Sequence, residues 1–200
     1  MTRTIDYFLA PQSPWTYLGH ARFVAMAQAA GAAVRVVPVD LGRVFPVSGG
    51  LPLARRAPQR QAYRLVDLQR FADHLGMPMV LQPRCFPVSG DAAARLIIAV
   101  DRADGADAAL RLTGAILRAV WEQERDISDG AVLADLLQAS GLDAARLQDA
   151  QAQVVQACYD ACTQEAIDGG IFGAPTYRID GELFWGQDRL DFVARKLAAA

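Results

Sequence analysis

The chain has 200 residues and 52% of them are hydrophobic, enough to bury the core of one compact domain or of one domain with an insertion. Twenty basic and twenty-two acidic residues leave a net charge of −2, which argues against nucleic acid or an anionic membrane as a partner and favours a small molecule. No apolar run reaches the roughly 18 residues of a membrane span and no secretory leader pattern is present, so we expect a soluble protein of the cytoplasm.

The N-terminal residues predict a strand, a helix and a second strand. Residues 5–9 form an apolar run, 14–30 have helical character and stop at Gly31, and 34–39 are rich in β-branched residues. The short crossover between the two strands predicts a parallel pair joined in the right-handed sense.

A stretch rich in glycine and proline, 45–58, predicts a loop after this unit. The chain then changes character, because helical apolar spacing dominates up to residue 167. The expected helices are 59–75, 91–103, 106–123, 129–140 and 148–167.

Strand character returns near the C-terminus. Residues 176–179 and 182–185 flank Asp180 and Gly181, a dipeptide suited to a tight hairpin turn. A last helix is expected over 188–198.

This order of elements is that of an α/β fold of the thioredoxin-like type, interrupted by helices. We expect 1–58 and 168–200 to form the thioredoxin-like domain and 59–167 to form an all-helical insertion domain.

The cysteines give no sign of a disulfide framework or a metal site. Cys85, Cys158 and Cys162 are an odd number without paired zinc-type spacing, so we expect them to be reduced and no metal to be bound. Cys158 and Cys162 are four residues apart in an expected helix and share a face, which favours buried thiols.

Ser13 and Pro14 lie where the first strand turns into the first helix. One interpretation is that Ser13 caps this helix and Pro14 fills its first position. The other is that the helix start favours a thiolate, whose sulfur accepts a hydrogen bond from the Ser13 hydroxyl. That thiol belongs to a cofactor, and glutathione is the obvious small candidate. Serine as a nucleophile is less favoured, because His20 is roughly 10 Å further along the helix.

A second informative stretch surrounds Ala174 and Pro175, which precede a predicted strand. The general expectation for such a proline is an ordinary trans turn. In thioredoxin-type folds, however, a cis-proline loop faces the first helix start, which would place Ala174 opposite Ser13. Asp188 either caps the last helix or, together with Gln187, holds the charged γ-glutamyl end of glutathione.

Taken together, the motifs SP at 13–14, GAPT at 173–176 and WGQDRL at 185–190 resemble those of the 2-hydroxychromene-2-carboxylate isomerase family. That family is related to kappa-class glutathione transferases and to DsbA-like proteins. The resemblance covers nearly the whole chain, and YRLVDLQRFA at 63–72 is similar to the family's first insertion helix. It implies a thioredoxin-like domain with a helical insertion, bound glutathione and a homodimer.

Carried over by position, the resemblance implies that Ser13 contacts the glutathione sulfur and is the catalytic residue. Ala174 would pair with the cysteinyl backbone, and Arg60 would reach the glycyl carboxylate. The implied glutathione-binding residues are Ser13, Arg60, Ala174, Pro175, Trp185, Gly186, Gln187 and Asp188.

The chain departs from the family pattern on the substrate side. Where the family has a lysine after its DLxRV stretch and an Asn-Arg pair before the insertion helix, this chain has Phe45 and Ala54-Arg55. We expect Phe45 and Arg55 to bind an aromatic substrate, with Arg55 on its carboxylate. The identity of the natural substrate stays open.

The implied reaction is reversible addition of the glutathione thiolate to an aromatic α,β-unsaturated keto acid, followed by bond rotation and elimination. Glutathione transfer of the kappa-class type is one alternative, and a non-catalytic module that binds thiol peptides is another. Disulfide exchange is disfavoured, because Ser13 and Thr16 give Ser-x-x-Thr in place of two thiols.

Overall fold

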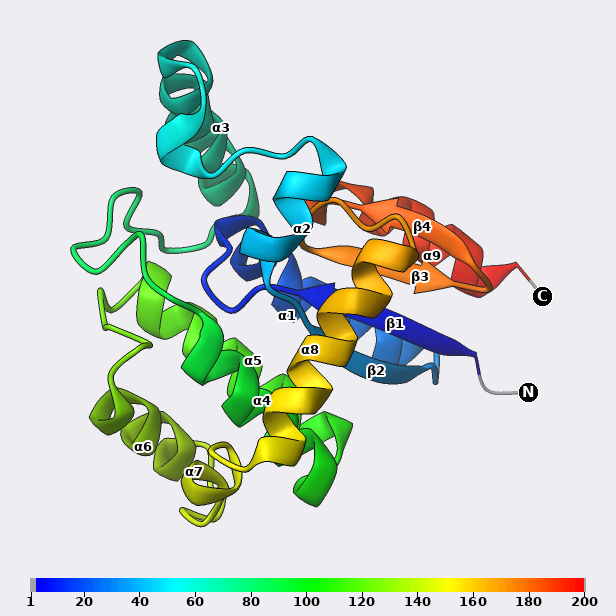
Figure 1. The fold of residues 1–200 in the computed structure, drawn as a ribbon. Coiled ribbons are helices and arrows are strands. Elements are labelled where there is room, and N and C mark those ends of the chain that lie inside the picture. The colour runs from blue at the N-terminus through cyan, green and yellow to red at the C-terminus, as the bar shows by residue number, and fades with distance from the viewer. Residues whose placement is uncertain (1–2, 200) are drawn as a thin grey trace.

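The structure is a computed structural model that describes residues 3–199. Its sheet has the strand order β2-β1-β3-β4. The strands are β1 (Thr4–Leu9), β2 (Ala33–Pro38), β3 (Thr176–Ile179) and β4 (Glu182–Trp185). β1 pairs in parallel with β2 and antiparallel with β3, and β3 and β4 form a hairpin. The two ends of the chain therefore share one sheet (Figure 1), which confirms the α/β thioredoxin-like fold with its helical insertion.

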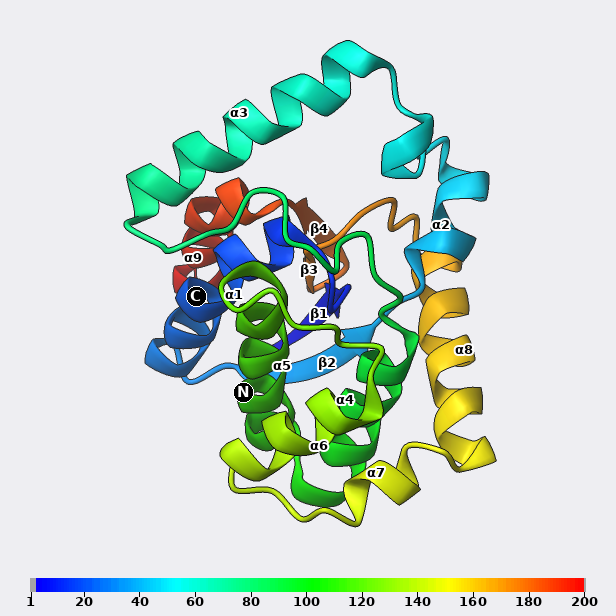
Figure 2. The same ribbon diagram turned by 90° about the vertical axis from the view of Figure 1, so that its left-hand side faces the viewer.

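Side chains of β1 alternate between two hydrophobic clusters, as the two-residue period of a strand requires. Ile5, Tyr7 and Leu9 join the larger cluster, which includes residues of α1 (Pro14–Ala29). Phe8 points the other way, into a smaller cluster with residues of α2 (Leu41–Ser48) and α8 (Gln153–Asp168). Figure 2 shows α1 and α8 on opposite sides of the sheet.

The helical segment between the two parts of the sheet shares the larger cluster. Its first four helices are α3 (Pro58–Leu75), α4 (Asp91–Asp104), α5 (Ala106–Trp121) and α6 (Gly130–Ala139). Leu96 of α4 and Leu112 of α5 are fully buried in the same cluster as Tyr7 of β1. These helices therefore contribute to the core that supports the sheet.

The loop predicted for 45–58 is partly wrong. Helix α2 occupies 41–48 although it contains Pro46, and a short 3-10 helix, η1 (Leu53–Arg55), follows it. The Asp40 side chain caps α2 by accepting a hydrogen bond of 2.7 Å from the N–H of Gly42. Burial of Val44 holds the helix against the sheet, so local capping and tertiary packing outweigh the proline.

Two helix boundaries near the C-terminus also differ from the prediction. The expected helix 148–167 is divided into α7 (Arg146–Asp149) and α8, and both Ala150 at the break and Val155 beyond it are buried. The last helix, α9 (Leu190–Ala198), starts after a 3-10 turn, η2 (Gln187–Arg189). Among residues 3–199, none of the helices combines the length and the apolarity that crossing a bilayer would take.

Candidate functional site

Ser13 is the N-cap of α1, so the capping interpretation is confirmed. Its Oγ accepts a hydrogen bond of 3.3 Å from the N–H of Thr16, and Pro14 occupies the first helical position. The Ser13 hydroxyl also donates to the carbonyl oxygen of Ala174 across 3.4 Å. That distance is long for a bond between two oxygens, so the hydroxyl can exchange this acceptor for a better one.

The segment before β3 forms the opposite wall of the site. The Ala174–Pro175 peptide is cis, as expected from the fold, and the Pro175 carbonyl accepts a hydrogen bond of 2.9 Å from the N–H of Gly186. Among residues 3–199, the N–H of Ala174 has no backbone partner. The main chain at Ala174 therefore keeps a donor available for an extended peptide.

Gln187 supports the η2 turn from inside the protein. Its side chain is 2% exposed, and Arg22 donates to both its main-chain and its side-chain oxygen. Gly19 of α1 makes this close approach possible, because a Cβ there would lie 2.8 Å from the Cβ of Gln187. The Gln187 side chain thus fixes the turn that carries Asp188.

Asp188 does not cap the last helix, so that interpretation is wrong. Arg189 occupies the N-cap position of α9 and Asp188 lies in the middle of η2. The Asp188 carboxylate is 41% exposed and pairs with the Arg189 guanidinium at 2.6 Å. Gly186 before it has a φ of 106°, which few other residues adopt.

An exposed aromatic pair borders Ala174. Trp185 at the end of β4 and Phe172 are about half exposed, and their ring centroids lie 4.6 Å apart. Gly173 lies directly under this pair, because a Cβ there would be 2.5 Å from the Trp185 Nε1. Large apolar side chains exposed together on a protein surface favour contact with a ligand.

Within residues 3–199, no hydrogen bond links Ser13 to the predicted substrate residues Phe45 and Arg55, or to Arg60, which is predicted to bind glutathione. Phe45 is half-buried on α2, and the Arg56 guanidinium lies 6.0 Å from the centroid of its ring. Arg55 is exposed at the end of η1, and Arg60 is exposed on the first turn of α3. Within residues 3–199, no hydrogen bond or ion pair holds the side chain of Arg55 or Arg60.

Sequence reasoning missed Arg56 and Arg64, which the structure buries more deeply than Arg55 and Arg60. Burial and the neighbouring Arg60 lower the pKa of Arg56. The signal in the sequence was the spacing of four residues from Arg56 to Arg60 and on to Arg64, which places Arg60 and Arg64 on one face of α3.

His20 and Cys162 are held in unreactive forms. His20 is buried, and burial together with the Arg118 charge lowers its pKa to about 4. Burial and the neighbouring Cys158 raise the pKa of the Cys162 thiol to about 12. Neither side chain therefore competes with an external thiolate near neutral pH.

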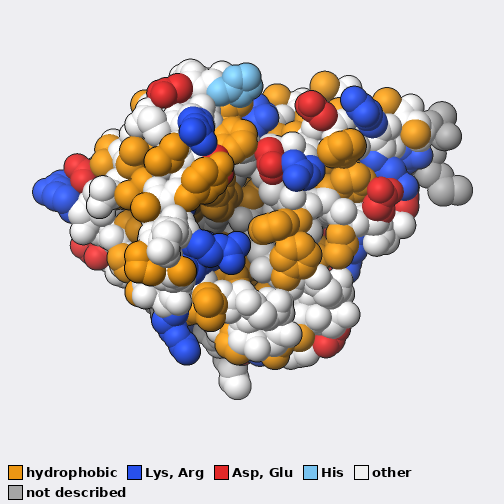
Figure 3. All heavy atoms as spheres, turned by 90° about the horizontal axis from the view of Figure 1, so that it is seen from above, with side chains coloured by type: hydrophobic (Ala, Val, Ile, Leu, Met, Phe, Trp, Pro, Cys, Tyr) orange, Lys and Arg blue, Asp and Glu red, His pale blue; other side chains and the backbone are white. Residues whose placement is uncertain are grey.

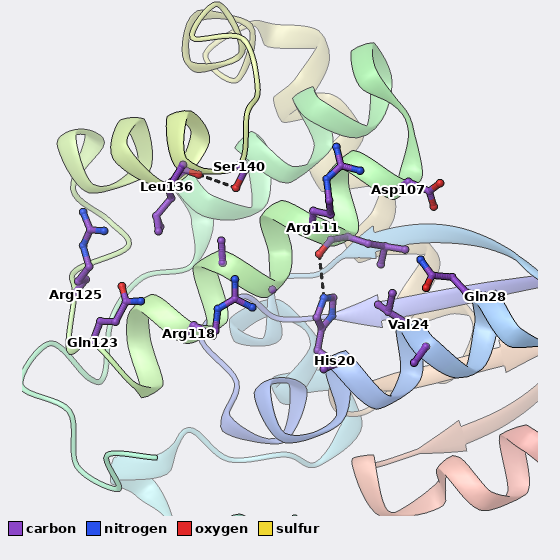
Figure 4. A pocket seen from close by; sticks show the side chains of 16 residues that line it. His20, Val24, Gln28, Asp107, Arg111, Arg118, Gln123, Arg125, Leu136 and Ser140 are labelled. Atoms are coloured by element: carbon purple, nitrogen blue, oxygen red, sulfur yellow. Dashed lines mark hydrogen bonds between the residues drawn. The ribbon is translucent and has the colours of Figure 1, made fainter. Parts of the chain in front are cut away.

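A cavity of about 760 Å³ lies elsewhere, between α1, α5 and α6 (Figure 4). His20 contributes to its lining, but both ring nitrogens of His20 are engaged, with the Tyr7 hydroxyl at 3.1 Å and the Leu110 carbonyl at 3.0 Å. Arg125 at its edge is paired with Asp135. This cavity therefore presents no free buried polar group, and the candidate site stays at Ser13.

No cluster suited to a metal ion occurs within 3–199, since three His, Cys, Asp or Glu side chains nowhere converge there. The donors at the site are hydroxyl and main-chain groups. They suit hydrogen bonding to a peptide-like ligand.

Comparisons with known proteins agree with this architecture. Residues 4–198 match the family model of the DSBA-like thioredoxin domain. The 2-hydroxychromene-2-carboxylate isomerase of Sphingobium xenophagum is 29% identical over 195 residues, which cover 96% of this chain and 97% of that protein. The enzyme of the same name from Pseudomonas putida is 28% identical over 188 residues, 93% of this chain and 90% of that protein. A solved structure of 2-hydroxychromene-2-carboxylate isomerase superposes with a TM-score of 0.81 at 28% identity, over 98% of this chain and 94% of that one. The chain thus belongs to the DSBA-like thioredoxin domain family and, as its motifs predict, is similar over nearly its whole length to 2-hydroxychromene-2-carboxylate isomerases.

Proposed function

We propose that the protein is a glutathione-dependent isomerase of an aromatic α,β-unsaturated keto acid of the 2-hydroxychromene-2-carboxylate type. One observation carries the proposal: the Ser13 hydroxyl caps α1 and lies 3.4 Å from the carbonyl oxygen of Ala174, beside the cis-proline. The names of the similar proteins support an isomerase of that family.

The residues around Ser13 fit a thiol tripeptide. The free N–H of Ala174 and its weakly bonded carbonyl suit the main chain of an extended cysteinyl residue. The half-exposed Asp188 carboxylate suits an α-ammonium group, and further away, on α3, Arg60 has no ion-pair partner within residues 3–199 and offers its guanidinium to a carboxylate. Trp185 and Phe172 cover the apolar part of such a ligand.

Bound glutathione would supply the thiolate that adds reversibly to the conjugated double bond and leaves again after rotation about the resulting single bond. The Ser13 hydroxyl would donate to the sulfur in place of the Ala174 carbonyl. The N–H of Trp15, which has no backbone partner within 3–199, adds a second donor at the positive end of α1. Both donors favour the ionised sulfur and lower its pKa, and each pKa unit corresponds to about 1.4 kcal/mol.

Ser13→Ala tests this role. Loss of a hydrogen bond to a charged sulfur is expected to lower kcat/KM for 2-hydroxychromene-2-carboxylate by at least about tenfold at saturating glutathione. Ser140→Ala is the matched control, because the Ser140 hydroxyl also donates to a backbone carbonyl, that of Leu136 at 2.7 Å in α6. Unchanged turnover in Ser13→Ala would contradict the role given to the hydroxyl.

Counting free thiol during turnover separates the alternatives. An isomerase returns the thiol, so its concentration stays constant while substrate is converted. Stoichiometric loss of thiol would instead indicate a kappa-class-like transferase. Glutathione binding without turnover would indicate a non-catalytic thiol-peptide module.

A further inference from the structure

Arg64 on α3 is a buried cation without a counter-ion. The residue is 9% exposed, and no hydrogen bond or ion pair involves its side chain within residues 3–199. Burial and the nearby Arg56 lower the pKa of Arg64 to about 10. A buried charge without a partner is unfavourable, and proteins keep such groups paired with an opposite charge. The described residues therefore supply no counter-ion for Arg64, and a bound anion could take that place.

The contacts of Arg64 leave one direction open for that partner. Its guanidinium carbon lies 5.3 Å from the ring centroid of Phe86 and 5.9 Å from that of Trp121, and these two rings pack on each other. Stacking covers the face of the guanidinium plane and leaves the N–H groups at its edge free. The Arg64 nitrogens are not among the fully buried polar atoms without partners, so they reach accessible space.

Two routes of contact connect Arg64 with the start of α1. The segment that begins at Phe86 ends at Gly90, which lies against the side chain of Gln12, the neighbour of Ser13. On α3, Phe71 lies two turns from Arg64 on the same face and packs edge-on against Trp15 at 6.0 Å. Through Phe86 on one side and Phe71 on the other, Arg64 is therefore linked by packed residues to the helix start that carries Ser13.

The surroundings of Arg64 are aromatic and positively charged. Arg56 next to it stacks on Phe45, so guanidinium groups and aromatic rings alternate in this region. Figure 3, viewed onto the end of the molecule that carries α2 and α3, shows hydrophobic side chains around a hollow with Lys or Arg side chains beside them. Such a surface matches a flat, apolar molecule with one negative group.

We infer that Arg64 is the residue that binds the carboxylate of the aromatic substrate, through the free N–H edge of its stacked guanidinium. This inference rests on the proposed function for the identity of the substrate. The role that the sequence predicts for the exposed Arg55 thus passes to the buried Arg64, whose two parallel N–H donors match a carboxylate. Phe86 and Trp121 hold the guanidinium plane in place, and Phe86, which is half-buried whereas Trp121 is fully buried, offers a surface for the substrate ring.

The test measures binding without turnover. Benzoate, a flat aromatic carboxylate that cannot isomerise, is titrated calorimetrically into the protein saturated with S-methylglutathione. Arg64→Met is expected to weaken benzoate binding by about 10- to 100-fold, while neutral benzamide binds both proteins equally weakly. Arg70→Met is the matched control, because Arg70 lies on the same helix, is exposed and also stacks on a ring, that of Tyr63. It is expected to keep wild-type affinity.

Each other outcome is decisive. Equal benzoate affinity in Arg64→Met and wild type, or no benzoate binding by wild type, would overturn the inference. Weaker binding of S-methylglutathione with unchanged benzoate binding would assign Arg64 to the carboxylate of the tripeptide and overturn it as well. The melting temperature of Arg64→Met without ligand is expected to stay close to that of wild type, because the methionine side chain keeps apolar contact with the two rings. An unchanged melting temperature excludes misfolding as the cause of weaker binding. Absence of thiol-dependent turnover in wild type would refute the proposed function and leave this binding result standing.

Discussion

Acidification to pH 5 is expected to destabilise the fold through a single buried side chain, His20. The Tyr7 hydroxyl donates to Nδ1 and Nε2 donates to the Leu110 carbonyl, an arrangement that requires the neutral ring. Burial and the Arg118 charge hold its pKa at about 4, against 6.5 in an unfolded chain. As the pH falls below 6.5, the unfolded chain takes up a proton at this position and the folded chain does not. The free energy of unfolding therefore decreases across this window.

The size of the effect follows from the two pKa values. The loss is about 2 kcal/mol between pH 7 and pH 5, and about 3 kcal/mol over the whole window. Both are a large part of the roughly 5–15 kcal/mol that holds a typical domain folded. The pKa values of Asp6 and Glu165 are lowered by Arg35 and Arg178. Their contribution to the free energy of unfolding is therefore lost only at lower pH and does not obscure this window.

Urea unfolding followed by circular dichroism at pH 7, 6 and 5 measures the loss. His20→Gln keeps a donor for the Leu110 carbonyl and does not titrate, so it is expected to be less stable at pH 7 but to lose little further stability by pH 5. His74→Gln, at the exposed histidine of α3, is the control and is expected to keep the wild-type pH dependence. The reasoning is refuted if His20→Gln and wild type lose the same free energy between pH 7 and pH 5.

Two further variants test the site and its chemistry. In Gly19→Ala the new Cβ would lie 2.8 Å from the Cβ of Gln187, so the turn that carries Asp188 must shift. We expect a loss of about 1–3 kcal/mol in unfolding free energy and weaker glutathione affinity by calorimetry. Gly130→Ala, where nothing lies within 4 Å of the new Cβ, is the control and is expected to keep the wild-type stability and affinity. Equal glutathione affinity in the two variants would contradict the close packing of Gly19 against Gln187. The double variant Cys158→Ser with Cys162→Ser is expected to retain wild-type thiol-dependent turnover, because the proposed chemistry uses no protein thiol, and a loss of kcat with an unchanged fold would argue for a redox role.

The sequence predicts the sheet and the capped helix well because their signals are local. The β-branched run of β2 and the Ser-Pro start of α1 place these elements within a residue or two. The opposition of Ser13 and Ala174 follows once the order of elements is recognised, since the fold brings the start of α1 to the segment before β3.

Other features depend on contacts that no local pattern contains. Ala and Gln around residue 150 favour a continuous helix, whereas the backbone becomes extended at Ala152, between the buried Ala150 and Val155. An arginine on a helix predicts a solvated side chain, whereas Arg64 is buried because Phe86 and Trp121 arrive from distant segments to stack on it. Packing partners far apart in the chain therefore decide which arginine of α3 is buried.

The separation of Ser13 and Ala174 in the chain, 161 positions, affects how the protein is made. On the ribosome, β1 and β2 emerge early and pair, but the other edge of β1 has no neighbour until β3 is synthesised. Until then that edge offers unpaired N–H and C=O groups to other nascent chains. Residues 176–179 must therefore be synthesised before this edge of β1 is covered, and the segment directly before them supplies Ala174 to the site.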